Sequence, residues 1–286
     1  MSEIVKLLFW LRSYGSQMKV GYVQFSPVFG DKEGNLKVIL RLLKEGADQE
    51  ADLLVLPEIC NTGYVFKSKR ELEVLSEEVP EGRTTRMLVD FAEETGVHVV
   101  AGLCEREGDR YFNTAVLLGP EGFIARYRKA HLFNEEKLWF SKGDTPFSVY
   151  DISKARVGMM ICFDWFFPEV IRILALKGAQ IVCHPSNLVL PYCQRALLGA
   201  AIQNRVFIIT ANRTGTERGV EFTGMSQILD PSMNVLARSG KNEEEVRVVE
   251  VNPEVADSKR INRFNDLWHD RRIELYQSLL NPRNSF

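Results

Sequence analysis

The sequence predicts a single layered α/β domain. Apolar segments typical of buried strands alternate with segments of helical periodicity, and no long linker, repeat or low-complexity stretch separates them. The chain has 286 residues, of which 45% are hydrophobic and 26% charged, as in a globular protein with a large core. Single α/β domains often reach this length, so the pattern requires no second domain.

The first half of the chain carries five predicted strands and three predicted helices. We expect Asn35 to cap the first helix and Gly96 to end the third. The strands are expected at 19–25, 52–58, 97–105, 112–118 and 123–129, and the helices at 35–50, 69–78 and 84–95.

The second half continues the alternation. We expect strands at 157–161, 181–185, 206–211, 222–229 and 245–251, and helices at 169–177 and 195–205. Residues 1–17 read as an N-terminal extension before a domain that spans 18–286, with a charged and aromatic tail from about residue 260. The apolar run in that extension, Leu7 to Trp10, is too short for a signal-peptide core or a membrane span.

Charge and cysteine content exclude several classes of partner. Lys and Arg number 36 and Asp and Glu 38, so no basic field attracts nucleic acid or an anionic membrane, and a small near-neutral substrate is expected. Five scattered cysteines indicate reduced thiols and a cytoplasmic location. Cys183, His184 and Cys193 do not have the spacing of a structural zinc site, so we expect no metal.

Three reactive side chains stand where apolar strands end: Glu58, Lys129 and Cys162. Strands of one sheet that end at the same rim bring such residues together however far apart they lie in sequence. A thiol needs a base, and a sheltered carboxylate near an ammonium can take its proton and return it to a leaving amine. The lysine can also stabilise the oxyanion of a tetrahedral intermediate.

Each of these assignments has a structural alternative. A free cysteine is commonly a buried apolar residue, and Cys162 taken alone could be one. His131 could form a Cys–His dyad, although a packing histidine is the simpler interpretation. Asp164 is expected to fix the corner after the strand rather than to act as an acid.

Three motifs in order give the chain a family resemblance. They are Leu56-Pro57-Glu58, the segment 127–133 (Tyr-Arg-Lys-Ala-His-Leu-Phe) and the segment 162–169 (Cys-Phe-Asp-Trp-Phe-Phe-Pro-Glu). With support from segments 211–213 and 222–231, the chain resembles the nitrilase, or carbon–nitrogen hydrolase, superfamily from about residue 18 to about residue 270.

The resemblance implies a four-layer αββα sandwich that assembles as a homodimer or a higher homo-oligomer. It also implies a catalytic triad without a cofactor: Glu58 as general base and acid, Lys129 as stabiliser of the intermediate, and Cys162 as nucleophile. The backbone N–H of Phe163 would complete the oxyanion site. A second glutamate is expected soon after the lysine; Glu136 matches best, with Glu135 as its neighbour.

The substrate is expected to be a small aliphatic or aromatic amide, hydrolysed through a thioester on Cys162. Many relatives that act on carboxylate-bearing substrates place Arg four residues after the cysteine, whereas this chain has Phe166. The residues expected to shape the apolar pocket are Tyr64, Trp165, Phe166, Asn187 and Tyr192.

Other activities remain open. Nitrilases often follow their cysteine with Trp-Glu, and Phe163-Asp164 here favours amides over nitriles. Hydrolysis of small nitriles or of N-carbamoyl compounds is an alternative. A scaffold that kept the fold and lost the chemistry is an alternative of a different class.

Overall fold

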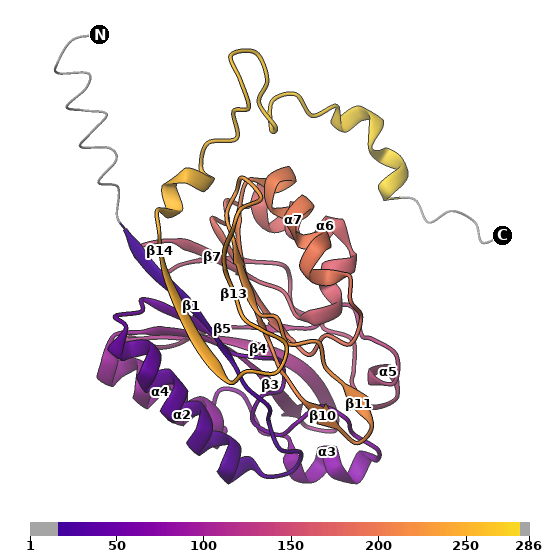
Figure 1. The fold of residues 1–286 in the computed structure, drawn as a ribbon. Helices are drawn as coiled ribbons and strands as arrows, with labels where there is room; N and C mark the ends of the chain where they lie inside the picture. Colours follow the sequence, from indigo (N-terminus) through magenta and orange to yellow (C-terminus); the bar gives the residue numbers. More distant parts are fainter. Residues whose placement is uncertain (1–16, 281–286) are drawn as a thin grey trace.

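Two six-stranded sheets packed face to face form the centre of the molecule, and helices cover their outer faces (Figure 1). This computed structural model describes residues 17–280. The strand orders are β14-β1-β2-β3-β4-β5 in the first sheet and β13-β12-β9-β8-β7-β6 in the second.

The first sheet is built almost entirely from the first half of the chain. Its strands are β1 (Met18–Gln24), β2 (Leu53–Val55), β3 (His98–Glu107), β4 (Arg110–Gly119), β5 (Gly122–Arg128) and β14 (Glu245–Val251). The helices of this half are α2 (Lys32–Asp48), α3 (Lys69–Leu75) and α4 (Arg83–Thr95).

The second sheet follows a short helix, α5 (Glu136–Trp139). Its strands are β6 (Val149–Asp151), β7 (Arg156–Met159), β8 (Ile181–Ser186), β9 (Phe207–Asn212), β12 (Gln227–Leu229) and β13 (Val235–Arg238), and a two-stranded ribbon is formed by β10 (Thr216–Glu217) and β11 (Val220–Glu221). The helices are η1 (Cys162–Phe166), α6 (Pro168–Leu176), α7 (Cys193–Asn204), η2 (Pro253–Ala256), η3 (Ile273–Leu275) and η4 (Gln277–Leu279).

Both sheets have a parallel centre and antiparallel edges. β1, β2 and β3 run parallel in the first sheet, and β7, β8 and β9 run parallel in the second. The strand pairs at the edges, such as β3 with β4 and β6 with β7, are antiparallel. Loops that follow the central strands therefore share one end of each sheet, which is where α/β proteins commonly place their sites.

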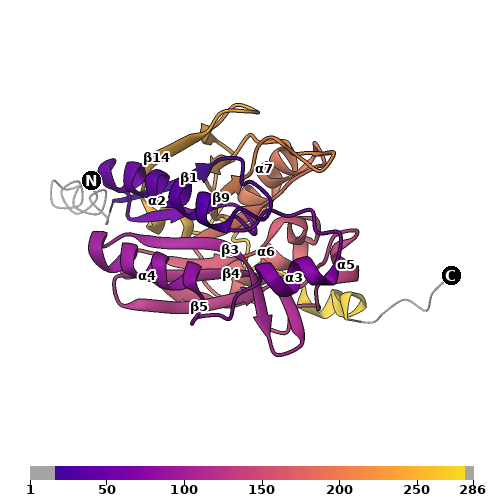
Figure 2. The same ribbon diagram turned by 90° about the horizontal axis from the view of Figure 1, so that it is seen from below.

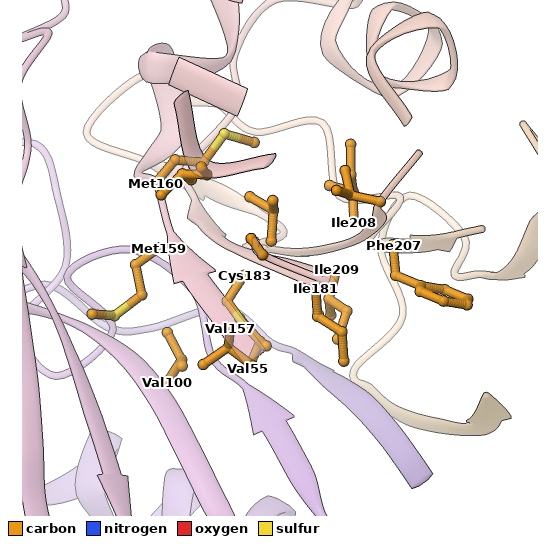
Figure 3. Packing of buried hydrophobic residues seen from close by; sticks show 14 of the residues in the cluster. Val55, Val100, Val157, Met159, Met160, Ile181, Cys183, Phe207, Ile208 and Ile209 are labelled. Carbon is orange, nitrogen blue, oxygen red and sulfur yellow. The ribbon is translucent and has the colours of Figure 1, made fainter. Parts of the chain in front are cut away.

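The space between the sheets is filled by apolar side chains from both. Figure 3 shows Val55 and Val100 of the first sheet beside Val157 and Met159 of the second, all buried. Strands covered on both faces need apolar residues at nearly every position, which explains the uninterrupted apolar runs in the sequence.

The outer faces are covered by two pairs of helices. α2 and α4 lie along the outer face of the first sheet (Figure 2). They pack against it through Ile39 and Leu43 of α2 and Leu88 and Phe91 of α4. α6 and α7 cover the second sheet in the same way, through residues such as Leu174 and Leu197. The layers are thus helix, sheet, sheet, helix, and the expected four-layer sandwich in a single domain is confirmed.

Several expected boundaries were wrong. The first helix begins at Lys32 because Asp31, not Asn35, caps it by accepting a hydrogen bond from the backbone N–H of Gly34. Asn35 is buried and bonds to the carbonyls of Val28 and Asn61, so it anchors a loop. The strand expected at 222–229 covers only 227–229, and the helix expected at 195–205 begins at Cys193.

The expected extension at 1–17 lies outside the described residues except for Gln17. From about residue 260 the chain runs past α6 with most side chains exposed, and Trp268 lies under the guanidinium of Arg172 at 5.0 Å. Among residues 17–280, no helix has the length and apolarity needed to cross a membrane.

Candidate active site

The structure brings Glu58, Lys129 and Cys162 together at one end of the sandwich. Glu58 lies three residues beyond the end of β2, Cys162 three residues beyond the end of β7, and Lys129 directly after β5. All three side chains are buried, and Lys129 Nζ donates a hydrogen bond to Glu58 Oε1 over 2.7 Å. Lys129 is held in place by its backbone N–H, which bonds to the carbonyl of Asn113 on β4.

Glu136 is the second glutamate at this cluster. Its Oε1 accepts hydrogen bonds from Lys129 Nζ at 2.7 Å and from the Tyr64 hydroxyl at 2.6 Å. Its Oε2 accepts one from the backbone N–H of Phe133 at 2.9 Å. Glu135 is exposed. The structure therefore places Glu136, and not its neighbour, beside the lysine.

Cys162 occupies a strained corner. The apolar strand ends at Met159, and Cys162 opens the helix η1 with a φ of 40°, in the left-handed region that residues other than glycine rarely adopt. Its carbonyl oxygen is held 2.9 Å from Nε2 of the buried His184. Phe163 follows in the first turn of this helix, where backbone N–H groups have no partner within the helix and can point at a ligand.

Asp164 fixes this corner from within. Its Oδ2 accepts hydrogen bonds from the backbone N–H of Ile161 at 2.9 Å and from the Tyr127 hydroxyl at 2.8 Å. Its Oδ1 lies 2.7 Å from His131 Nδ1 and accepts from the backbone N–H of the same histidine. His131 also stacks on Phe167, with ring centroids 3.7 Å apart. His131 packs at this corner as expected, with its ring bonded to a side chain, and Asp164 holds the backbone of the corner.

Burial controls the protonation of the cluster. Burial raises the pKa of Glu58 to about 7, since it outweighs the attraction of the Lys129 charge. The pKa of the Cys162 thiol is raised well above its usual value by burial and by the nearby Glu58. Burial opposes the charge on Lys129, but Glu136 and Glu58 outweigh it, so the lysine pKa is raised. The lysine stays charged, while Glu58 can exchange a proton near neutral pH.

A small cleft opens beside the thiol. The residues that line it are Phe133, Cys162, Phe163, Trp165, Asn187, Leu188, Val189 and Leu190. A second cleft, lined by Tyr64 and Glu136, shares Phe133 and Val189 with the first. Asn187, which lines the cleft beside Cys162, also contacts the segment that carries Glu58, because its Nδ2 donates to the backbone carbonyl of Glu58.

Two residues expected in the pocket lie elsewhere. Phe166 is 52% exposed and Tyr192 is 54% exposed, and neither lines the cleft beside Cys162. Phe166 follows the turn of η1 outward and packs on the Trp165 ring at a centroid distance of 4.7 Å. Trp165 and Asn187 do line the cleft.

Sequence reasoning missed Asn113. This side chain is buried on β4, and its Nδ2 donates to Glu58 Oε1 at 2.6 Å. The signal was present in the sequence, since Asn113 is a lone amide inside a strand that is otherwise mainly apolar. A polar side chain buried in such a strand needs a partner. Within residues 17–280, no group of three or more His, Cys, Asp or Glu side chains is arranged to hold a metal ion.

Comparison with known proteins agrees with this geometry. Residues 19–261 match the profile of the family described as Carbon-nitrogen hydrolase. The chain is 48% identical to a protein named nitrilase from Pyrococcus abyssi, over 91% of this chain and 99% of that one. It is 34% identical to an (R)-stereoselective amidase from a Pseudomonas species, over 90% and 93% of the two chains.

A solved structure extends the comparison to three dimensions. The amidase from Nesterenkonia sp. is similar with a TM-score of 0.78 and 27% identity, over 93% of this chain and 97% of that one. Mutants of that amidase have been solved in complex with acrylamide and with butyramide, and another shows covalent addition of the acetamide moiety of fluoroacetamide at its active site cysteine.

The fold and these comparisons define the chain as a hydrolase. The chain belongs to the carbon–nitrogen hydrolase family, within the nitrilase superfamily.

Proposed function

We propose that this carbon–nitrogen hydrolase is an amidase that releases ammonia from small neutral amides through a thioester on Cys162. One observation carries the proposal. Glu58 Oε1 is held by Lys129 and Asn113, whereas Glu58 Oε2 is buried without a hydrogen-bond partner among the described residues. A buried carboxylate oxygen without a partner is costly in a purely structural role and is what a general base requires.

The first half-reaction follows from these positions. Glu58 accepts the thiol proton as Cys162 Sγ bonds to the amide carbon, and the carbonyl oxygen becomes an oxyanion. Lys129 Nζ and the backbone N–H of Phe163 stabilise that charge in a buried site, where such donors are most effective. The carbon–nitrogen bond breaks as Glu58 returns the proton to nitrogen, so ammonia leaves and the thioester remains.

The second half-reaction uses the same groups. Glu58 takes a proton from water, and the resulting hydroxide bonds to the thioester carbon. The carbon–sulfur bond then breaks, the carboxylic acid leaves, and the proton on Glu58 returns to the thiolate. Glu136 holds Lys129 throughout, because Nζ donates to both carboxylates over 2.7 Å. Water is the second reactant, and every proton transfer in both steps passes through groups of this chain.

The lining of the cleft supports a neutral acyl group. Around Cys162 it is formed by aromatic and aliphatic side chains and one amide, and no charged side chain is among them. Arg213 is buried and bonds to Glu217 at 2.6 Å and to the carbonyl of Pro27. Arg195 is exposed and lies on α7. Neither arginine therefore offers a partner to a substrate carboxylate.

The solved relatives support the same substrate class. The Nesterenkonia amidase has been captured with acrylamide and butyramide, which are small and neutral. The covalent adduct on its cysteine supports a covalent role for Cys162 here.

Ammonia release from matched pairs of an amide and a nitrile with the same acyl group tests the proposal, with Cys162→Ala as the blank. We expect turnover of the amide, slow or no turnover of the nitrile, and an acyl adduct on the wild-type protein by intact mass. Amides that carry a terminal carboxylate should react at least about tenfold more slowly than neutral ones of the same length, because the cleft offers no cation. Faster turnover of the carboxylate-bearing amide would contradict the neutral pocket.

A nitrilase activity is the second candidate. It is favoured by one observation, the 48% identity to the Pyrococcus abyssi protein named nitrilase. Efficient release of ammonia from the nitrile in the same experiment would select it. No release from either compound would turn attention to carbamoyl substrates and then to a non-catalytic relative.

A further inference from the structure

We propose that Asn113 is a positioning residue for the reaction: it fixes the Glu58 carboxylate in one orientation, so that Oε1 is engaged and Oε2 is left to accept the thiol proton. The inference rests on the proposed role of Glu58 as the base. It assigns to Asn113 a function that the three motifs of the family resemblance do not cover.

Asn113 contacts three members of the site from the middle of β4. Its Nδ2 donates to Glu58 Oε1 at 2.6 Å and lies 3.4 Å from Glu136 Oε1. Its backbone carbonyl accepts the backbone N–H of Lys129 at 2.8 Å. The strand β4 is paired on both sides, with β3 and with β5, so Asn113 stands on a rigid support. One residue thus links both carboxylates and the lysine to the sheet.

The chemistry of the contacts fixes the direction of the amide. An ionised carboxylate can only accept hydrogen bonds, so the NH₂ group of Asn113 must face Glu58 and Glu136. Its Oδ1 is then buried without a partner among the described residues. An unpaired buried oxygen costs free energy, and a donation to a charged group is among the stronger hydrogen bonds that can offset this cost.

The two donors to Glu58 are placed asymmetrically. Both Asn113 Nδ2 and Lys129 Nζ converge on Oε1, at 2.6 and 2.7 Å. Oε2 has no partner among residues 17–280. A carboxylate held by one oxygen against two donors cannot rotate freely. The free oxygen of Glu58, Oε2, is therefore held in one position, from which it can accept a proton.

Asn113 differs from the other groups that act on Glu58. The charged and titratable groups that act on this carboxylate are Lys129, Glu136, Cys162, Tyr64 and Arg213. Asn113 donates a hydrogen bond without adding a charge, and this bond lowers the pKa of Glu58 against the large increase that burial causes. Removal of the donor should therefore raise that pKa further.

The test exchanges Asn113 for a side chain of similar size without a donor, Asn113→Leu. The readout is the rate of Cys162 alkylation by iodoacetamide as a function of pH, scored by intact mass, alongside kcat/KM for the amide. We expect the acidic limb of both profiles to move up by about one pH unit, the equivalent of about a tenfold lower rate on that limb. Asn113→Asp should move it at least as far, since it replaces the donor with a second acidic group.

The matched control is Asn61→Leu. Asn61 is also buried and close to Glu58 in sequence, but its Nδ2 bonds to the Thr84 hydroxyl. This variant should leave the limb where it is in the wild type. If Asn113 had a purely structural role, its replacement would lower the fraction of protein that is alkylated at Cys162 and the melting temperature, but it would not shift the acidic limb of the pH profile. That outcome would overturn the proposal.

The two proposals fail separately. If the wild type releases no ammonia from amides or nitriles, the proposed function fails, yet the alkylation profile still reports whether Asn113 acts on Glu58. If turnover is normal and the limb does not move in a folded Asn113→Leu or Asn113→Asp variant, only the role of Asn113 is wrong.

Discussion

Gly102 lies directly against the backbone of Glu58: a Cβ atom at position 102 would be 2.4 Å from Glu58 Cα. Gly102 lies in β3 and Glu58 in the loop that follows the neighbouring strand β2, and the two segments are joined by hydrogen bonds from Gly102 N to the carbonyl of Pro57 and from Cys60 N to the carbonyl of Gly102. The backbone of Glu58, the proposed base, therefore packs so closely against Gly102 that no side chain fits at position 102.

Gly102→Ala should lower activity more than it lowers folding yield. The methyl group meets backbone atoms, which cannot rotate away, so Glu58 must shift, at a cost of about 1–3 kcal/mol in the free energy of unfolding. A displacement of the base by a fraction of an ångström should reduce kcat by about tenfold or more. Enzyme assays and urea unfolding of the same preparation measure both effects.

The control for this variant is Gly199→Ala. A Cβ at Gly199 in α7 would meet nothing within 4 Å, so the exchange should be neutral or stabilise the helix by up to about 1 kcal/mol. Full activity in Gly102→Ala would show that the close approach to Glu58 is not needed.

Lys129→Met should reduce kcat by at least about 10²-fold, because the intermediate loses its buried cation. Lys129→Arg should not restore activity, since the planar guanidinium cannot occupy the place of Nζ, which lies 2.7 Å from both carboxylates. The measurement is single-turnover kinetics with an amide, together with circular dichroism to establish folding.

Lys154→Met serves as the comparison for the loss of a lysine. Lys154 pairs with Asp52 at the surface, so its replacement should change neither activity nor stability by much. Equal activity of Lys129→Met and the wild type would remove the lysine from the mechanism.

The pH profile of kcat/KM should have an acidic limb near pH 7. Burial raises the pKa of Glu58 to about 7, and the base form exists above that value. Activity should therefore fall about tenfold for each pH unit below the limb and level off above it. We do not expect the buried His184 to produce this limb, because burial lowers its pKa to about 4.

A histidine origin of the limb can be tested directly. His131→Gln should keep the limb in place, since His131 bonds to Asp164 and not to the cluster around Lys129. A limb that vanishes in this variant would contradict the assignment to Glu58.

Asp164→Leu should destabilise the corner that carries Cys162. The exchange leaves the backbone N–H of Ile161 and the Tyr127 hydroxyl without their acceptor, at a cost of about 1–3 kcal/mol for each buried donor. We expect a lower midpoint in urea and slower alkylation of Cys162. Tyr127→Phe removes one of these bonds and the acceptor of the Ala130 backbone N–H, and it should show a smaller stability loss and nearly normal alkylation. A loss as large as that of Asp164→Leu would assign the effect to the tyrosine.

Much of the site could be predicted because its residues interrupt a simple pattern. Glu58 and Cys162 each follow an apolar run that is buried on both faces, and Lys129 follows the end of the edge strand β5. The family motifs then assigned an order and a chemistry to these three positions. The start of the first helix was predicted wrongly, because Asp31 and Asn35 are both residue types that cap helices. Only the folded loop shows that Asp31 is the cap and that Asn35 bonds to loop carbonyls.

The sequence by itself determined the class of fold, the three strand ends and the family, because these depend on local periodicity and on residue type. Three features could be seen only in the tertiary structure. Glu136 and not Glu135 lies beside Lys129, Phe166 is exposed outside the cleft, and Asn113 bonds to Glu58. These outcomes depend on the direction in which a side chain leaves a turn or a strand. That direction is set by packing between segments far apart in the sequence, which no local pattern records.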